Sequence, residues 1–160
     1  MSSRSARARP DLRKSLVGFL IGGTHYAVGV GCVRQVVNPS RTTPIPQAPP
    51  FVVGLAEFRD DVIPIIDFRV FLGAPAELTR RTKWLVLDVG ERPVGLVVDA
   101  VTGVFGTTGE VRAAPVAVGG EATRCIVGVA SHESAMVYVI EPARLQIPLA
   151  PLIERASLPA

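Results

Sequence analysis

An internal repeat limits what this 160-residue chain can fold into more than any other feature of its sequence. Aligning the sequence with itself pairs Ile21-Gly22 with Val89-Gly90 and keeps the apolar positions of this first block matched as far as residues 36–37 and 104–105. A slightly longer offset then aligns a second block, in which residues 53–56 fall on residues 127–130. Because the two blocks keep their order, residues 18–69 and 86–143 are predicted to be two copies of one structural unit.

Each copy has the pattern of several short β-strands. Apolar runs flank Gly22–His25 in one copy and Gly90–Pro93 in the other, as in a β-hairpin, and polar loops follow at 57–61 and 131–134. Aromatic residues make up only 6% of the chain, and 15 glycines and 14 prolines separate the runs of Val, Ile and Leu, which favours strands. Since closing a small sheet removes its exposed edges, we predict an all-β fold of two barrels that share a hydrophobic core.

The connecting segments differ from the strands in composition. Residues 39–50 contain five prolines and are expected to cross the surface as extended chain. Gly73–Thr82 reads as a polar linker between the halves. Glu141–Leu145 predicts a short C-terminal helix with proline in its first turn, limited by the prolines that follow.

The positive charge of the chain lies in its first residues. Residues 1–15 carry five basic residues and one acidic residue, so a net charge of +4 there leaves −1 for the remainder. We interpret 1–15 as a flexible basic leader. The apolar stretch Leu16–Ile21 is too short to span a membrane, and Cys32 and Cys125 have the apolar neighbours of buried thiols in a reducing compartment, so a cytoplasmic location is expected.

No residue pattern predicts catalysis. The two histidines, His25 and His132, fall in predicted turns without other ligands at metal-binding spacing, so neither a metal nor a cofactor is expected. Four acidic residues end or interrupt strands and are expected to cap turns: Asp67, Asp88, Asp99 and Glu141. The glycines form no phosphate-binding loop ahead of a helix, so the chain is predicted not to be an enzyme.

Residues 53–69 resemble the signature of CheW-type chemotaxis coupling proteins, Gly-Val-x-Asn-Leu-Arg-Gly followed by Pro-Ile/Val-x-Asp-Leu-Arg. The matching positions are Gly54, Arg59, Pro64, Asp67 and Arg69. Further similarity at 33–37, 94–101 and 140–145 extends the resemblance over residues 15–150 in register. The resemblance implies two SH3-like five-stranded barrels within a CheW-like domain at 16–150, followed by a tail at 151–160.

The resemblance also implies a function and its partners. A protein of this family is expected to be a non-catalytic adaptor in chemosensory signal transduction. It would bind the regulatory domain of a CheA-type histidine kinase and the cytoplasmic tip of a methyl-accepting chemoreceptor, and it would be membrane-associated only through receptor arrays. The residues that the resemblance assigns to partner binding are Arg59, Gly54, Glu57, Phe58, Val33, Gln35, Gly95 and Val104.

Several of these positions have a plain structural alternative. Gly54 and Gly95 could be required at a bulge or for close strand packing, and Val33 and Val104 could be ordinary core residues. The chain also departs from the family pattern: residues 57–60 read Glu-Phe-Arg-Asp in place of Asn-Leu-Arg-Gly, and Gln35 replaces a usual Glu. Because charge complementarity selects partners, these departures indicate a divergent member that serves a specialised system. No kinase, phosphotransfer or receiver module fits in the remaining residues, which favours a stand-alone coupling protein.

Two other functions remain open from the sequence. A nucleic-acid-binding barrel would use the Arg-rich leader on phosphates, but Trp84, Tyr26 and Tyr138 are isolated in the sequence, and single-strand binding needs clustered rings. A small-ligand barrel would need an internal cavity, and the small size of each half does not favour one.

Overall fold

A computed structural model describes residues 15–106, 111–113 and 124–145, and in them ten strands form two five-stranded sheets. The strands are β1 (Ser15–Ile21), β2 (Thr24–Gly29), β3 (Val33–Val37), β4 (Val52–Phe58), β5 (Asp61–Asp67), β6 (Lys83–Val89), β7 (Arg92–Val98), β8 (Ala100–Gly106), β9 (Ile126–His132) and β10 (Ala135–Ile140). The predicted all-β class is therefore confirmed. Ser15 opens β1 and is not part of a leader; residues 1–14 and the tail at 151–160 lie outside the described residues.

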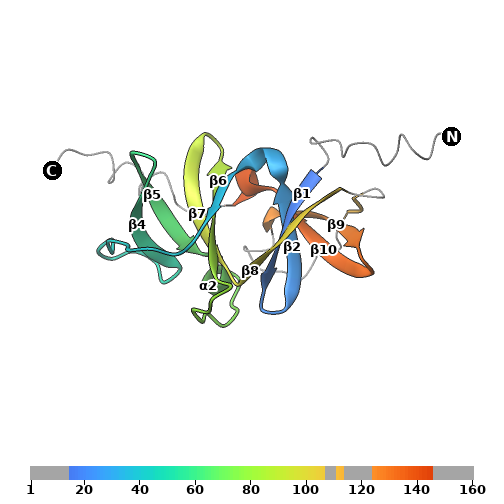
Figure 1. Cartoon of the computed structure of the whole chain (residues 1–160), viewed down its shortest axis with the longest axis horizontal. Helices are drawn as coiled ribbons and strands as arrows, with labels where there is room; N and C mark the ends of the chain where they lie inside the picture. Colours follow the sequence, from blue (N-terminus) through green and yellow to red (C-terminus); the bar gives the residue numbers. More distant parts are fainter. Residues whose placement is uncertain (1–14, 107–110, 114–123, 146–160) are drawn as a thin grey trace.

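Each sheet takes strands from both halves of the sequence. The order in the first sheet, barrel A, is β8-β1-β2-β10-β9, and the order in the second, barrel B, is β3-β6-β7-β5-β4. Figure 1 shows the two barrels side by side, with β4–β7 in one and β1, β2, β9 and β10 in the other. The pairs β2–β10 and β5–β7 are parallel, and the remaining pairs are antiparallel. The barrels are thus intertwined, because the second half supplies three strands to barrel A and two to barrel B.

The sequence repeat is visible in the strand positions. β6 starts at the position that the first block aligns with the start of β1, and β9 starts where the second block aligns the start of β4. The second-block hairpins turn on two residues, Arg59-Asp60 and Glu133-Ser134, all with positive φ. These loops are shorter than the polar segments predicted from the sequence. A two-residue type I′ turn is enough, because its backbone twist matches that of the paired strands.

Three groups of buried side chains fill the molecule. Ala56, Ile63 and Trp84 belong to the group inside barrel B, whereas Ala27 and Val137 belong to the group inside barrel A. The largest group lies between the barrels and collects side chains from both sheets: Val17, Phe19, Ile21, Val28, Ile66, Phe68, Leu85, Leu87, Val94, Leu96, Val98, Cys125, Ile126, Ile140 and Leu145. This shared group is the common core that the sequence predicted.

Short helical segments follow two of the strand-end carboxylates. Asp67 caps α2 (Phe68–Phe71) by accepting a hydrogen bond from the backbone N–H of Arg69 at 3.0 Å. Glu141 caps η3 (Pro142–Arg144) in the same way, so the expected C-terminal helix is a single 3-10 turn in the described part of the chain. None of the helices formed by the described residues is long and apolar enough to cross a membrane.

The aromatic rings are less isolated than the sequence indicated. Tyr26 lies 5.7 Å from Tyr138 and 5.8 Å from Phe19, measured between ring centroids, and Phe68 lies 6.3 Å from Tyr26. The isolation expected for the two tyrosines is therefore wrong, because the parallel pairing of β2 with β10 brings them together. Phe19 and Phe68 are fully buried, so this cluster is part of the shared core.

Candidate functional site

The turn between β4 and β5 carries Arg59, whose guanidinium contacts Gln35 on one side and the ring of Phe58 on the other. The Arg59 guanidinium donates a hydrogen bond from Nη2 to Oε1 of Gln35 at 2.6 Å. The same guanidinium lies 5.4 Å from the centroid of the Phe58 ring, within the range of a cation–π contact. Arg59 and Asp60 adopt φ angles of 47° and 68°, which fix the direction of the turn. Three of the residues predicted for partner binding are thus in contact.

These residues line a groove of about 300 Å³ on barrel B. The groove lies between β3 and β4, the two edge strands of this sheet. The Arg59–Gln35 hydrogen bond crosses from one edge to the other, and Glu57 lies along the groove next to Phe58. Since Gln35 is neutral and none of the ion pairs in the described part of the chain includes Arg59, its charge is available to a partner.

An exposed apolar strip beside this groove was not predicted from the sequence. Val62 is 52% exposed and pairs across the hairpin with Glu57, and Val53 is also exposed on the same strand pair. A second hollow of about 540 Å³, lined in part by Leu55, Val62 and Arg41, adjoins the strip. The alternation of Val62 with the buried Ile63 is the only sequence signal, and it cannot distinguish an outward apolar residue from one covered by another segment.

Gly54 and Gly95 are buried and have structural reasons to be glycine. Gly54 lies at a bulge of β4 with φ 151°, and a Cβ there would collide with the carbonyl of Thr43, which crosses the strand. At Gly95, a Cβ would lie 2.6 Å from the Cδ1 of Ile65. These contacts support the bulge and close-packing alternative for both glycines, and their direct part in partner binding stays a prediction.

The two valines predicted to line a receptor groove lie in different places. Val33, on β3, is half-buried and packs against the core between the barrels. Val104, on β8 of barrel A, is 61% exposed and pairs with Val17. Neither residue lines the groove that holds Arg59, so the structure groups four of the eight predicted residues and separates the rest.

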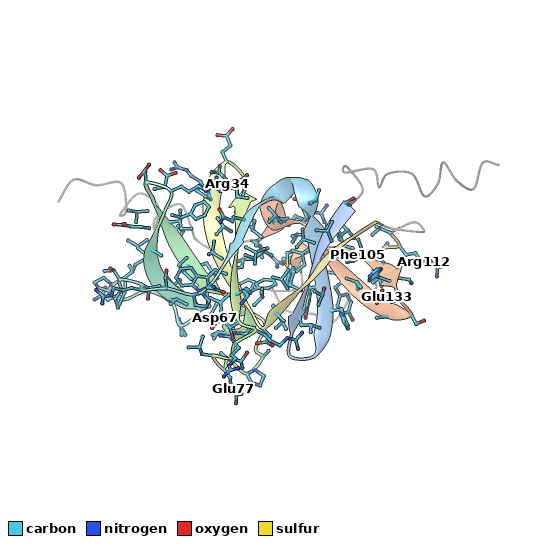
Figure 2. The ribbon with its side chains drawn as sticks, viewed as in Figure 1. Arg34, Asp67, Glu77, Phe105, Arg112 and Glu133 are labelled. Atoms are coloured by element: carbon cyan, nitrogen blue, oxygen red, sulfur yellow. The ribbon has the colours of Figure 1, made fainter. Side chains whose placement is uncertain are left out.

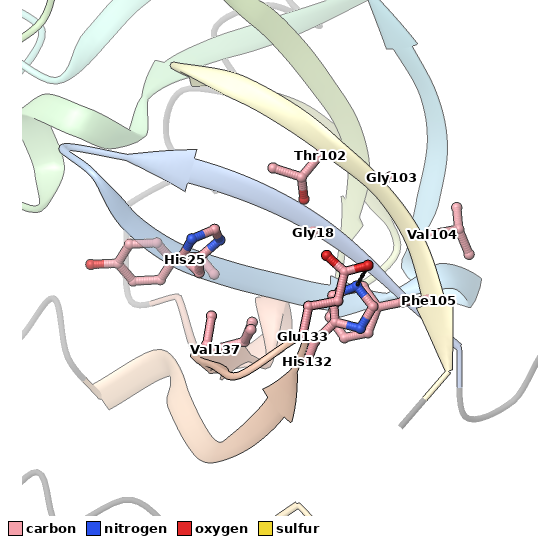
Figure 3. Close-up of a pocket in the computed structure, with 11 residues that line it drawn as sticks. Gly18, His25, Thr102, Gly103, Val104, Phe105, His132, Glu133 and Val137 are labelled. Carbon is pink, nitrogen blue, oxygen red and sulfur yellow. Dashed lines mark ion pairs between the residues drawn. The ribbon is translucent and has the colours of Figure 1, made fainter. Parts of the chain in front are cut away.

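Barrel A carries a counterpart of the Arg59 groove with different chemistry. A hollow of about 560 Å³ lies beside the edge strands β8 and β9 (Figure 3). The rings of Phe105 and His132 stack across it with centroids 4.0 Å apart. In the second block of the repeat, His132 and Glu133 align with Phe58 and Arg59, so an acidic residue occupies the position of the arginine. His132 is therefore a packing residue of the barrel edge.

The structure corrects the placement of both histidines. His25 lies in β2 and His132 ends β9, whereas the sequence placed both in turns. The turns are shorter than expected, at Gly22-Gly23 and Glu133-Ser134, so these side chains belong to strands. Among the residues that the structure describes, no group of three potential ligands could hold a metal ion.

Strand-end carboxylates form a polar network at the junction of the barrels. The Arg69 guanidinium forms two hydrogen bonds of 3.0 Å to Asp67 and donates one at 3.1 Å to Asp99 and one at 2.6 Å to the carbonyl of Glu77. Asp99 in turn accepts a hydrogen bond from the backbone N–H of Gly22 at 2.8 Å. Hydrogen bonding to Asp67 raises the pKa of Arg69, which therefore keeps its charge although it is buried.

The roles predicted for the carboxylates agree with these contacts in part. Asp67, Asp99 and Glu141 each accept a backbone N–H, as turn-capping residues do, whereas Asp88 pairs with Arg34 at 2.7 Å. The sequence located the first three at strand ends but gave no sign that two of them share an arginine.

Comparison with known proteins decides the family. The profile of the CheW-like domain matches residues 15–147, a span that includes every strand described above. The chain belongs to the CheW-like domain family. The resemblance read from residues 53–69 is thereby confirmed.

Individual CheW-like proteins agree with this assignment. The chain is 38% identical over 93 residues to chemotaxis protein CheW of Rhizobium meliloti, and this match covers 58% of the chain and 60% of the relative. It is 30% identical over 129 residues to chemotaxis protein CheW of Klebsiella aerogenes, covering 79% of the chain and 78% of the relative. The matches to two Rhizobium relatives span 60% and 64% of those proteins.

A solved structure of the same family has the same fold. The crystal structure of the scaffolding protein TtCheW from Thermoanaerobacter tengcongensis superimposes with a TM-score of 0.74 at 24% sequence identity, covering 83% of the chain and 90% of that protein. The CheW-like domain thus has the two five-stranded barrels that the resemblance implied.

Proposed function

We propose that this CheW-like protein is a non-catalytic adaptor that couples chemoreceptors to a CheA-type histidine kinase in the cytoplasm. The observation that carries the proposal is the grouping of Arg59, Gln35 and Phe58 at one groove of a chain that belongs to this family. The relatives named chemotaxis protein CheW support chemosensory signalling as its setting. No bond is made or broken by the protein in this function.

The kinase regulatory domain is proposed to bind the outer side of the β4–β5 hairpin. Arg59 is fixed in one conformation by a hydrogen bond and a ring contact, so it loses little side-chain entropy when a partner docks. The exposed valines Val53 and Val62 supply apolar area next to this charge. An apolar centre with an arginine beside it is the composition found at many protein interfaces.

The receptor tip is proposed to bind elsewhere, near Val33 and Val104. Val33 belongs to the margin of the inter-barrel core, and Val104 is an exposed apolar side chain of barrel A. Two partners could then bind at the same time, which is what an adaptor requires. The acidic Glu57 and the neutral Gln35 give this chain its own charge pattern, so we propose that it serves a specialised chemosensory system.

Co-purification with the CheA-type kinase of the same cell tests the kinase site. Arg59→Ala is expected to weaken kinase binding at least about tenfold, as for interface arginines whose truncation costs about 1.4 kcal/mol or more. Arg81→Ala is the matched control, because Arg81 is exposed in the linker and its side chain makes no hydrogen bond or ion pair within the described ranges. Undiminished binding of the Arg59 variant, or an equal loss in both variants, would contradict the proposal.

A further inference from the structure

The chain passes between the two barrels at two places that the repeat makes equivalent. The first passage is η1 (Val30–Cys32), between β2 of barrel A and β3 of barrel B. The second is Asp99, between β7 of barrel B and β8 of barrel A. Gly31, in the middle of the first passage, is the residue that the first block of the repeat aligns with Asp99. These two passages are the only backbone connections between the two sheets in the described residues, and the barrels are also held together by the shared core described above.

The passage at Asp99 is pinned to both barrels. Its backbone N–H donates to the carbonyl of Leu20 at 3.0 Å, and its Oδ2 accepts from the N–H of Gly22 at 2.8 Å, so both bonds hold the β1–β2 hairpin of barrel A. Its Oδ1 accepts from Nη1 of Arg69 at 3.1 Å. Arg69 is buried at the end of barrel B and is itself fixed by two hydrogen bonds to Asp67.

The passage at Gly31 has none of these restraints. Gly31 has no side chain, and a Cβ built there would meet nothing within 4 Å. The residue that begins this turn, Gly29, is also a glycine and therefore has no side chain that could cap the turn. The residue that the second block aligns with Arg69 is Ala143. At the first passage, therefore, Gly31 takes the place of the Asp99 carboxylate and Ala143 takes the place of the Arg69 guanidinium.

The two passages lie on opposite sides of barrel B. In Figure 2, Asp67 and Glu77, which both bond Arg69, lie at the lower side of the molecule, and Arg34, which follows the first passage closely in the chain, lies at the upper side. Arg34 pairs with Asp88 of the adjacent strand β6, so its ion pair stays within barrel B. The side-chain hydrogen bonds of Asp99 and Arg69 therefore join the two barrels on the lower side of the molecule.

We propose that Asp99 is a positioning residue that restricts rotation of one barrel relative to the other. Without its contacts, we expect the barrels to rotate about the passage at Gly31. The carboxylate bridges a buried arginine of one barrel and a backbone N–H of the other, so any rotation at this side must break a charge-assisted hydrogen bond. Rotation about the other side breaks no such bond at Gly31. The consequence for signalling rests on the proposed function: the contacts of Asp99 limit how far the kinase and receptor surfaces can rotate relative to each other.

Spin-label distances between the barrel tips test the joint directly. Cysteines for spin labels are placed at Asp60 and Ser134, in the exposed turns of the two second-block hairpins, so that their distance reports the angle between the barrels. Cys32→Ser removes the more accessible native thiol, and Cys125 is buried and should not react with the label. Asp99→Ala is expected to broaden and shift the distance distribution relative to the background protein. Asp88→Ala is the matched control, because it removes a carboxylate–arginine pair within one barrel and should leave the distribution unchanged.

A second variant and a second readout separate positioning from folding. Asp99→Asn keeps the shape and one acceptor, so it decides the question if Asp99→Ala does not fold; an unchanged distribution in a folded Asp99 variant would overturn the inference. Asp99→Asn should retain binding to kinase and receptor fragment separately while receptor control of kinase activity falls by at least about fivefold, the low end of typical coupling between sites. If the unaltered protein binds neither partner, the proposed function fails, and the tip-to-tip distances still decide the role of Asp99.

Discussion

Replacing Arg69 with Met should destabilise the fold far more than the same change at an exposed arginine. The Arg69 side chain is 6% exposed, and its principal partner Asp67 is 12% exposed. Removing one member of a buried ion pair costs about 3–5 kcal/mol, because a carboxylate remains without compensation. We expect about 3 kcal/mol, the low end of that range, since water reaches the second partner, Asp99, which is 33% exposed.

The matched comparison is Arg34→Met. Arg34 pairs with Asp88 at the shorter distance of 2.7 Å, yet its side chain is 43% exposed. Exposed pairs contribute about 0–1 kcal/mol because solvent and salt screen them. The shorter bond should therefore be the weaker contributor, and burial decides which arginine the fold needs.

Urea unfolding measures both variants with an intrinsic probe. Trp84 is the only tryptophan, lies inside barrel B and is buried, so its fluorescence reports the loss of the core. A loss of about 3 kcal/mol corresponds to a fall of about 10 °C in Tm for a domain of this size. Adding Asp67→Asn to Arg69→Met should restore part of the loss by removing the unpaired charge. A difference below about 1 kcal/mol between the two arginine variants would refute the reasoning.

Two further predictions concern the core. Gly54→Ala should destabilise more than Gly95→Ala in the same urea assay, because the added methyl at Gly54 meets the rigid backbone of Thr43 at a positive φ, whereas at Gly95 it meets the movable end of Ile65; equal losses would contradict this. Burial raises the pKa of Cys125 to about 11, so above pH 9 the unfolded chain ionises this thiol first and stability should fall between pH 9 and 11. At about 1.4 kcal/mol for each unit of pKa, this loss of stability is at most about 3 kcal/mol. Cys125→Ala should flatten the stability curve between pH 9 and 11, and an equal fall in that variant would contradict the assignment to this thiol.

The hairpins and their repetition were predictable from the sequence. Gly22-Gly23 and the alternation around residues 57–61 mark tight turns between strands, and such local signals need no knowledge of the rest of the chain. The bounds were less accurate: His25 and His132 read as turn residues because the sequence does not show how few residues a type I′ turn needs. The family also followed from local order, since Gly54, Arg59 and Asp67 stand at the spacing of a known signature.

The grouping of the candidate site is in part a tertiary result. Arg59 and Gln35 are well separated in the chain and meet because β3 and β4 are the two edges of one curled sheet. Exposure of Val62 and burial of Gly54 likewise depend on which segments cross the outer face of the hairpin. The alternating pattern of a strand is the same whether its outward residues face solvent or another segment. The sequence therefore identifies these residues as strand residues but does not predict which of them are exposed.

The number and kind of the repeating units follow from local patterns, because hydrophobic alternation and turn residues act within a few positions of each other. The exchange of strands between the halves and the contact between Arg69 and Asp99 depend on the tertiary fold. The paired strands and the Arg69–Asp99 contact join segments far apart in the chain, whereas Asp67 and Glu77 are only two and eight positions from Arg69. The exchanged strands are stabilised mainly by burial of apolar side chains from both sheets, and no local sequence pattern specifies which distant strand will cover them.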